Sequence, residues 1–265
     1  MKKKSLRIAA GITAVLLICG LAVIANAFLG NPVSYLLAKK CVERNLAEHH
    51  ADQGFVLQSL VYNFKDTAYT AFAEVPNTLD YHFEMSVSMT GKLRYDTYAD
   101  DVESGKNTFL RLDQEYRDLA DTVLDSNALP FRTSTDFGTL KDSGIPAWWQ
   151  NGVLEPDGSY NIQELGAQYG IITISVGEQD VTAERAAEIL LQTKEIMMQR
   201  GVPFHDISLS LHQPWKDEGV PPEETEGKTF FDLKAIHIQL FPFDEIYEDG
   251  LTERIKATAE FQNIT

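Results

Sequence analysis

An uncharged stretch of twenty-two residues, Ile8 to Leu29, limits what this chain can fold into more than any other feature. A helix rises about 1.5 Å per residue, so this stretch reaches roughly 33 Å, enough to cross the hydrocarbon core of a bilayer. Four basic residues precede it: Lys2, Lys3, Lys4 and Arg7. Because positive residues favour the cytoplasmic side, we expect a single-pass protein of the cell membrane with a cytoplasmic N-terminus and extracytoplasmic domains.

Two other interpretations of residues 1–30 stay open. Ala25-Asn26-Ala27 has the small-x-small form of a signal-peptidase site, so cleavage after Ala27 is the alternative to a retained anchor. The apolar stretch is longer than the roughly 7–15 residues of a usual signal-peptide core, which favours retention. Cys19 follows Ile18 where a lipidated cysteine would follow a small residue, which disfavours lipidation. Each interpretation exports the same domains.

The charge and cysteine content narrow the class of protein. The chain carries 23 Lys+Arg against 39 Asp+Glu, and without the four N-terminal basic residues 19 stand against 39, a net charge of about −20. Such a charge repels nucleic acid and anionic lipid headgroups, so we expect neither as a partner of the exported part. Cys41 is the one cysteine after the apolar stretch, so the fold cannot rest on an internal disulfide, and we expect a buried, inert thiol.

Hydrophobic periodicity predicts a first α+β domain over residues 31–127. Asn31-Pro32 is typical of a helix start, and the helix is expected over 33–52. Four segments in which every second residue is apolar follow, separated by short turns: Leu60 to Phe64, Tyr69 to Val75, Tyr81 to Val87, and Leu93 to Tyr95. Turns this short require an antiparallel meander. A second helix, with apolar residues at helical spacing from Phe109 to Val123, is expected to cover the sheet with the first.

Residues 128–158 are rich in glycine and proline, and we interpret them as an interdomain linker. They contain Trp148 and Trp149, and Trp215 begins a long acidic loop further on. Tryptophan is enriched at the centres of interfaces, so these three are candidate partner contacts. The alternative for the first two is that they dock the linker onto a domain.

A second α+β domain is predicted over residues 159–265. The order strand–helix–strand is that of a parallel crossover. The expected strands are 172–176 and 207–211, and the helix between them covers 183–200 with Thr182 as its cap. An antiparallel strand over 236–240 and a closing helix over 248–261 complete a small sandwich. The overall fold class is therefore α+β: an N-terminal transmembrane helix followed by two helix-on-sheet domains.

The sequence contains no nucleophile elbow, phosphate loop, dinucleotide fingerprint, H-E-x-x-H pair or C-x-x-C pair. We therefore expect no cofactor, no dedicated metal site and no identifiable catalytic residues. Zinc held by His212, His237 and a carboxylate is the metal alternative. A deep pocket lined by His205 or His237 with desolvated acids would instead favour a hydrolase.

Several local strings together resemble the YfjL-like proteins of Gram-positive bacteria. They are the basic N-terminus with its anchor, Gly30-Asn31-Pro32, Tyr62 to Asp66, Ser104 to Thr108, Glu164 to Gly170 and Gly201 to Phe204. The strings consist of caps, turns and strand starts. The resemblance implies a membrane-anchored, two-domain envelope protein and no catalytic residues to transfer. The first domain is also similar in outline to PepSY-type domains, which are associated with protease regulation, and that likeness is topological only.

Three functions are compatible with these observations. The leading hypothesis is a non-enzymatic, membrane-tethered extracytoplasmic binding or interaction module, whose partners are the membrane, through the N-terminal helix, and an envelope protein. The first alternative is a cell-envelope hydrolase with a dispersed active site. The second is an acidic surface protein that binds calcium or a basic partner, for which salt-sensitive binding would be the signature.

Overall fold

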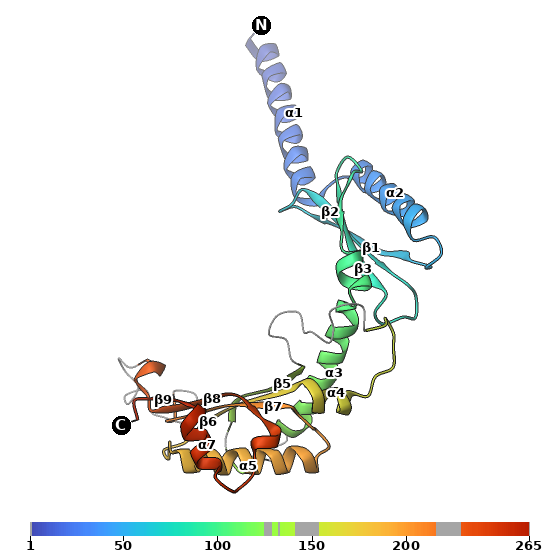
Figure 1. The fold of residues 1–265 in the computed structure, drawn as a ribbon. Helices are drawn as coiled ribbons and strands as arrows, with labels where there is room; N and C mark the ends of the chain where they lie inside the picture. The colour runs from blue at the N-terminus through green and yellow to red at the C-terminus, as the bar shows by residue number, and fades with distance from the viewer. Residues whose placement is uncertain (1, 125–128, 132, 141–153, 216–228, 265) are drawn as a thin grey trace. The chain divides into compact units, whose positions relative to one another are not determined.

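The computed structural model describes residues 2–124, 129–131, 133–140, 154–215 and 229–264. The chain divides into two compact units (Figure 1). The first unit comprises residues 1–108 with 148–158, and the second comprises 109–147 with 159–265. Both are helix-and-sheet structures, so the predicted α+β class is confirmed.

The N-terminal helix is α1, Lys2–Leu29. The side chains described for it, from Gly11 on, are exposed and carry no charge. Among the described residues, this is the helix with the length and apolar composition to cross a membrane, and a signal sequence has the same properties. The predicted long apolar helix is confirmed.

Helix α2, Pro32–His49, starts where the sequence places it. The Asn31 side chain accepts a hydrogen bond from the Ser34 backbone N–H at 2.8 Å, and the Ser34 hydroxyl oxygen accepts one from the Asn31 N–H at 3.3 Å. This reciprocal capping box satisfies two of the backbone donors that a helix start leaves unpaired. The helix ends at His49, earlier than predicted.

Four antiparallel strands form sheet A in the order β1-β2-β3-β4, so the predicted meander is confirmed. They are β1 Val56–Asn63, β2 Ala68–Glu74, β3 His82–Ser88 and β4 Leu93–Asp96. One face of the sheet packs on α2 around a core that includes Cys41, Leu46, Phe83 and Met85. The Cys41 thiol is buried, as expected.

Helix α3, Lys106–Leu124, corrects the predicted domain plan. From Phe109 onward it belongs to the second unit rather than covering sheet A. The Tyr116 hydroxyl donates a hydrogen bond to the Pro203 carbonyl oxygen at 2.9 Å, and its ring lies against Gly166 and Gly170. The apolar stripe of α3 was recognised correctly, but a stripe does not reveal which sheet it packs on.

The expected linker is corrected as well. Strand β5, Thr133–Leu140, lies inside residues 128–158 and pairs with β6 in the second unit. Residues 154–158 belong to the first unit. There the carboxylates of Asp80 and Asp157 each accept backbone hydrogen bonds from the segment that carries the other. The Asp157 carboxylate accepts from the backbone N–H groups of Leu79 and Asp80, and the Asp80 carboxylate accepts from the Asp157 N–H, each at 2.8 Å.

Sheet B of the second unit has the order β5-β6-β7-β8-β9. Strands β6 and β7 are parallel and joined through α5, as predicted, and β7 pairs antiparallel with β8, also as predicted. The closing helix is shorter than expected because the chain turns into β9. The elements are α4 Ile162–Tyr169, β6 Gly170–Gly177, α5 Ala183–Gln199, β7 Asp206–His212, β8 Ala235–Pro242, α7 Leu251–Thr258 and β9 Glu260–Gln262. Short helical turns occur at η1 Ala99–Glu103, η3 Phe230–Asp232 and η4 Phe243–Glu245.

Tyr116 is the largest fully buried side chain of the second unit. A side chain at Gly166 or Gly170 would collide with it, because an added Cβ would lie 2.4 Å from a Tyr116 atom at either position. Burial raises the pKa of the Tyr116 hydroxyl well above its usual value near 10. These close approaches explain why two glycines flank the turn from α4 into β6.

Candidate functional site

A groove of about 760 Å³ runs between helix α2 and strand β1 in the first unit. One wall is the face of α2, and the other is the edge strand with the loop before it. The lining residues are Tyr35, Lys39, Glu43, Leu46, Ala47, His50 and Ala51 from the helix side, and Phe55, Val56, Leu57, Gln58, Ser59 and Leu60 from the strand side. We call this feature the α2–β1 groove.

The helix wall follows from the spacing of its residues. Tyr35, Lys39 and Glu43 are four apart, and Leu46, Ala47 and His50 continue the same stripe. Lys39 and Glu43 lie 3.7 Å apart with exposed side chains, so this ion pair contributes little to stability. The wall is thus apolar toward His50 and polar in its middle.

The strand wall is β1, which is an edge strand of sheet A among the described residues. Strand β1 pairs with β2 on one side, and its other edge faces the groove. A register shift between Leu57 and Ser59 marks a bulge, which brings Leu57 and Leu60, three residues apart, onto the core side. An edge strand offers backbone N–H and C=O groups that another extended chain can pair with.

The aromatic rings of His50 and Phe55 line the groove at the C-terminal end of α2, and those of Phe83 and Tyr98 pack on them. The His50 ring centre lies 4.3 Å from that of Tyr98 and 5.2 Å from that of Phe83, and Phe55 packs on Phe83 at 5.1 Å. His50 is buried although the sequence places it in a polar last turn. We call His50, Phe55, Phe83 and Tyr98 the aromatic cluster.

A hydrogen-bond chain fixes two members of this cluster. The Gln53 side-chain oxygen lies 2.9 Å from His50 Nδ1, and its amide nitrogen donates to the Tyr98 hydroxyl at 2.6 Å. The three residues come from the helix end, the following turn and the segment after β4. The end of the groove is therefore set by contacts between parts of the chain about 45 residues apart.

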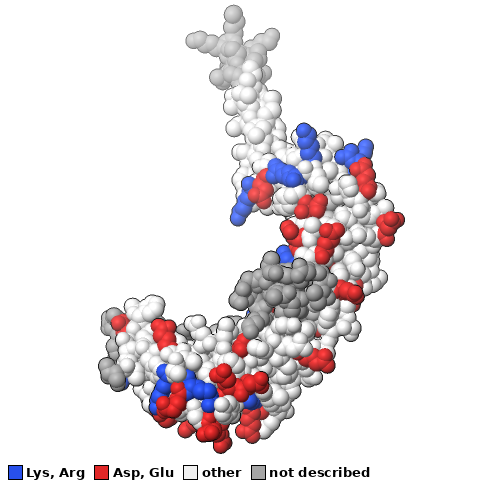
Figure 2. Space-filling model, in the orientation of Figure 1, with Lys and Arg blue, Asp and Glu red and all other residues white. Residues whose placement is uncertain are grey.

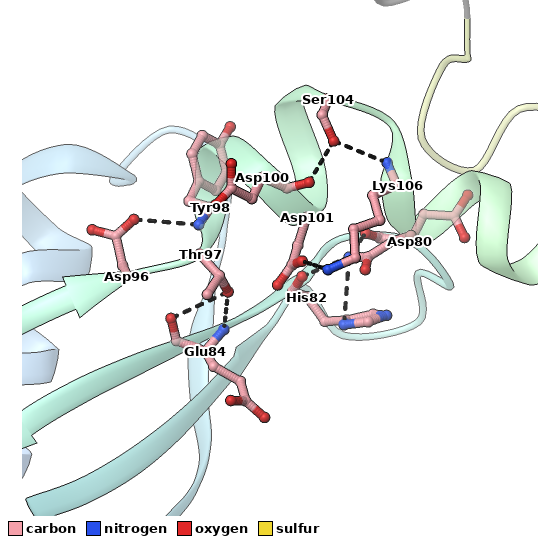
Figure 3. A network of polar contacts seen from close by, with 11 residues as sticks. Asp80, His82, Glu84, Asp96, Thr97, Tyr98, Asp100, Asp101, Ser104 and Lys106 are labelled. Atoms are coloured by element: carbon pink, nitrogen blue, oxygen red, sulfur yellow. Dashed lines mark hydrogen bonds and ion pairs between the residues drawn. The ribbon is translucent and has the colours of Figure 1, made fainter. Parts of the chain in front are cut away.

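A polar network holds the segment that carries Tyr98 (Figure 3). The Asp96 carboxylate accepts from the Tyr98 N–H at 3.2 Å, and the Thr97 hydroxyl accepts from the Glu84 N–H at 2.9 Å. Further along, Lys106 Nζ lies 2.7 Å from Asp101 Oδ1. This network orders the backbone around η1 and positions Tyr98, whose ring packs on His50.

The acidic residues of this segment thereby have structural partners. Ser104 donates to the Asp100 backbone carbonyl, and its hydroxyl oxygen accepts from the Lys106 N–H at 3.2 Å. Asp96 and Asp101 are engaged as described above (Figure 3). In the described part of the chain, no three His, Cys, Asp or Glu side chains gather so as to hold a metal ion.

The histidines of sheet B pair with serines. His212 Nε2 lies 2.9 Å from the Ser175 hydroxyl, and its Nδ1 lies 2.9 Å from the Gln213 carbonyl oxygen. His237 Nδ1 lies 3.1 Å from the Ser210 hydroxyl. The strand register puts Ser210 opposite His237 and two residues from His212, so both histidines share one face of the sheet.

His205 lies just before β7 and close to the residue that follows it in the chain. Its Nδ1 is 3.0 Å from the Asp206 carboxylate, and the histidine side chain is about half exposed. Neither His205 nor His237 lines the α2–β1 groove. The α2–β1 groove is therefore not the histidine-lined pocket that would favour a hydrolase.

Of the three predicted contact tryptophans, Trp215 is described, and it does not line the groove. Trp148 and Trp149 lie outside the described residues, and Trp215 is half-buried just after β7 in the second unit. Sequence reasoning missed the groove because Leu46 and Phe55 have the pattern of core residues, while Lys39 and Glu43 have the pattern of a solvated helix face. The available signal was the unpaired first strand of a four-strand meander directly after a helix.

Comparison with known proteins covers both units. The family model described as YfjL-like, N-terminal domain matches residues 2–97, and the one described as YfjL-like C-terminal domain matches residues 115–256. The gap between the two matches contains the boundary at residues 108–109 between the two units. No curated protein and no solved structure gives a significant match.

Proposed function

The chain belongs to the YfjL-like family, and from that premise we propose that it is a membrane-tethered, extracytoplasmic binding module without enzymatic activity. Its N-terminal helix is retained as the anchor, with the basic residues before it in the cytoplasm. Its ligand is an extended segment of an envelope protein. The segment binds in the α2–β1 groove as an added strand beside β1.

The observation that carries this proposal is the free strand edge beside an apolar helix face. In strand addition, backbone hydrogen bonds to an exposed edge supply affinity, and pockets for alternate side chains supply specificity. The groove has both elements, since β1 offers its edge and Leu46, Ala47 and Phe55 offer apolar contact. We expect the ligand to carry apolar residues at every second position.

The aromatic cluster supports a binding role in a second way. Its rings pack on one another, and hydrogen bonds through Gln53 fix His50 and Tyr98, so the groove end is preorganised. A rigid site loses less conformational entropy when a ligand binds. The His50 side chain in this cluster therefore serves as a packed wall of the groove.

Filling the groove should abolish peptide binding. Ala47 is exposed on α2 and lines the groove, so Ala47→Trp places a large side chain where the ligand's residues insert, without altering the core. Peptides are first selected from a random library on the full-length chain in nanodiscs. We expect the affinity of the selected peptides to fall by about tenfold or more, the effect of losing a buried apolar anchor.

Glu48→Trp is the matched control, because Glu48 is exposed on the neighbouring position of α2 and is not a groove residue. Its affinity should match that of the parent chain. Equal binding by all three proteins would contradict the proposal. If Ala47→Trp leaves the peptide affinity unchanged while added salt lowers it steeply, the acidic surface would instead be the binding site.

A further inference from the structure

The first unit has one end that is tied to the anchor helix. The Tyr62 hydroxyl donates to the Ala27 backbone oxygen at 3.3 Å, and the Phe28 and Phe64 ring centres are 5.4 Å apart. Gly30, with φ of +69°, turns the chain from α1 into α2 against the ring of Tyr62. The β1–β2 turn therefore lies beside the last turn of α1.

The β3–β4 turn lies at the same end. Tyr62 also approaches Met89, with 3.6 Å between hydroxyl oxygen and sulfur, and Gly91 lies against the Leu37 backbone. This end thus combines the first turns of α2 with both hairpin turns of sheet A. We call it the anchor-proximal end.

The anchor-proximal end exposes large apolar side chains. Val33 and Leu36 on α2 and Val61 on β1 are each more than 60% exposed, and Phe64 is 49% exposed. Single exposed apolar residues are common on soluble proteins, but several at one end of a unit are typical of a binding surface. Two residues, Gly30 and Asn31, separate α2 from the end of α1, and the Phe64 ring contacts Phe28 of α1. The apolar surface of the anchor therefore continues onto the first unit.

A cavity of about 530 Å³ lies at this junction. Tyrosine and aliphatic side chains line it: Leu29, Pro32, Tyr35, Val61, Tyr62 and Tyr69. Tyrosine is enriched where proteins meet the headgroup region of a bilayer, because its ring is apolar and its hydroxyl is polar. A cavity of this composition is suited to the upper part of a lipid molecule.

The local charge at the anchor-proximal end differs from the net negative charge of the exported part, from which repulsion of anionic headgroups was expected. Lys65 and Lys92 lie in the two hairpin turns of the anchor-proximal end, with Asp66 beside the first. The opposite end carries Asp80 and Asp157. Figure 2 shows blue Lys and Arg side chains near the base of the white anchor helix, within a molecule that has more acidic than basic residues. Basic residues at a membrane surface attract anionic lipid headgroups.

We infer that the anchor-proximal end is a lipid-binding surface that lies in the headgroup region of the bilayer and favours anionic phospholipid. The inference rests on a retained anchor, which is part of the proposed function, and is independent of any peptide in the groove. The first unit is then seated on the membrane rather than held above it on a flexible stalk. An amphipathic surface of this kind sits roughly 5–10 Å into the headgroup–acyl boundary.

Depth measurements on the full-length chain in nanodiscs test this inference. An environment-sensitive fluorophore is placed on Phe64→Cys or Leu36→Cys in a background with Cys19→Ala and Cys41→Ala. Leu79→Cys is the control, because Leu79 is 67% exposed in the turn between β2 and β3, at the opposite end of the sheet. We expect lipids carrying a nitroxide near the headgroup to quench the first two labels about threefold more than the control label.

Two comparisons make the result decisive. With Lys65→Glu and Lys92→Glu combined, quenching at position 64 should fall in anionic nanodiscs and stay unchanged in zwitterionic ones. Equal quenching at positions 36, 64 and 79 would overturn the inference, and so would failure of the chain to remain in the nanodisc. Loss of peptide binding in Ala47→Trp, measured on the same nanodiscs, reports on the groove alone, so failure of one proposal is distinguishable from failure of the other.

Discussion

Replacing Tyr116 by alanine should lower the free energy of unfolding of the second unit by about 3–5 kcal/mol, the usual loss for a large buried aromatic side chain. The Tyr116 ring is fully buried against Gly166 and Gly170, so its removal leaves a cavity between α3 and the start of β6. The Pro203 carbonyl also loses its hydrogen-bond donor. Amide hydrogen exchange of β6 and β7 in the full-length chain measures the loss for this unit separately.

Tyr116→Phe is the control, because it keeps the ring and removes the hydroxyl. We expect a loss of about 1 kcal/mol, the net value of one hydrogen bond. Because the folded pKa of Tyr116 is raised, its contribution is complete below pH 10 and declines as the pH rises above 10, where the unfolded chain ionises. The gap between parent and Tyr116→Phe should therefore narrow at high pH. A loss below 1 kcal/mol in Tyr116→Ala would contradict the assignment of α3 to the second unit.

Replacing Phe83 by alanine should have an effect of similar size on the first unit, about 3–5 kcal/mol. Phe83 is fully buried at the centre of the aromatic cluster, with His50, Phe55 and Tyr98 around it. Without its ring, these three side chains lose their shared support. We expect peptide affinity to decrease together with stability, and hydrogen exchange of β2 and β3 measures the stability part.

Leu79→Ala is the comparison for Phe83→Ala. Leu79 is a large apolar residue of the same unit that is mostly exposed, so its truncation should change stability by less than about 0.5 kcal/mol. Similar losses in the two variants would show that the aromatic cluster does not organise the first unit.

Local patterns in the sequence predict much of this fold. Asn31-Pro32 predicts the start of α2 because a cap and a fixed proline φ are local properties. The alternation through β2 and β3 predicts a meander because the turns between the strands are too short for any other connection. Likewise Thr182 predicts the start of α5, whose crossover makes β6 and β7 parallel.

The predictions are wrong where the structure depends on which helices and strands pack on each other. The apolar stripe that contains Tyr116 predicts that one face of α3 is buried. The residues that contact Tyr116, Gly166 and Pro203, are 50 or more residues away in the chain. Strand β5 was missed because its surroundings are rich in glycine and proline, which is typical of linkers. The bulge between Leu57 and Ser59 shifts the alternation in β1, so the phase of the strand is not constant.

The candidate site also depends on which elements pack together, so local sequence patterns do not reveal it. A groove exists because a helix and a strand edge stand at a certain distance, and no single residue in it is unusual for a core or a surface. Tryptophan content directed attention to Trp215, whereas the groove is built from ordinary residues such as Ala47 and Leu60. The feature on which the proposed function depends, the position of β1 at an edge of sheet A, comes from the structure.

Hydrogen exchange of the full-length chain with and without a selected peptide tests the added-strand claim most directly. If the peptide pairs with the edge of β1, amides of Val56–Asn63 should exchange about tenfold or more slowly in its presence, since new backbone hydrogen bonds protect them. Strand β4, Leu93–Asp96, is the other edge of the same sheet and should be unchanged. Unaltered exchange in β1 while the peptide is bound would contradict the account.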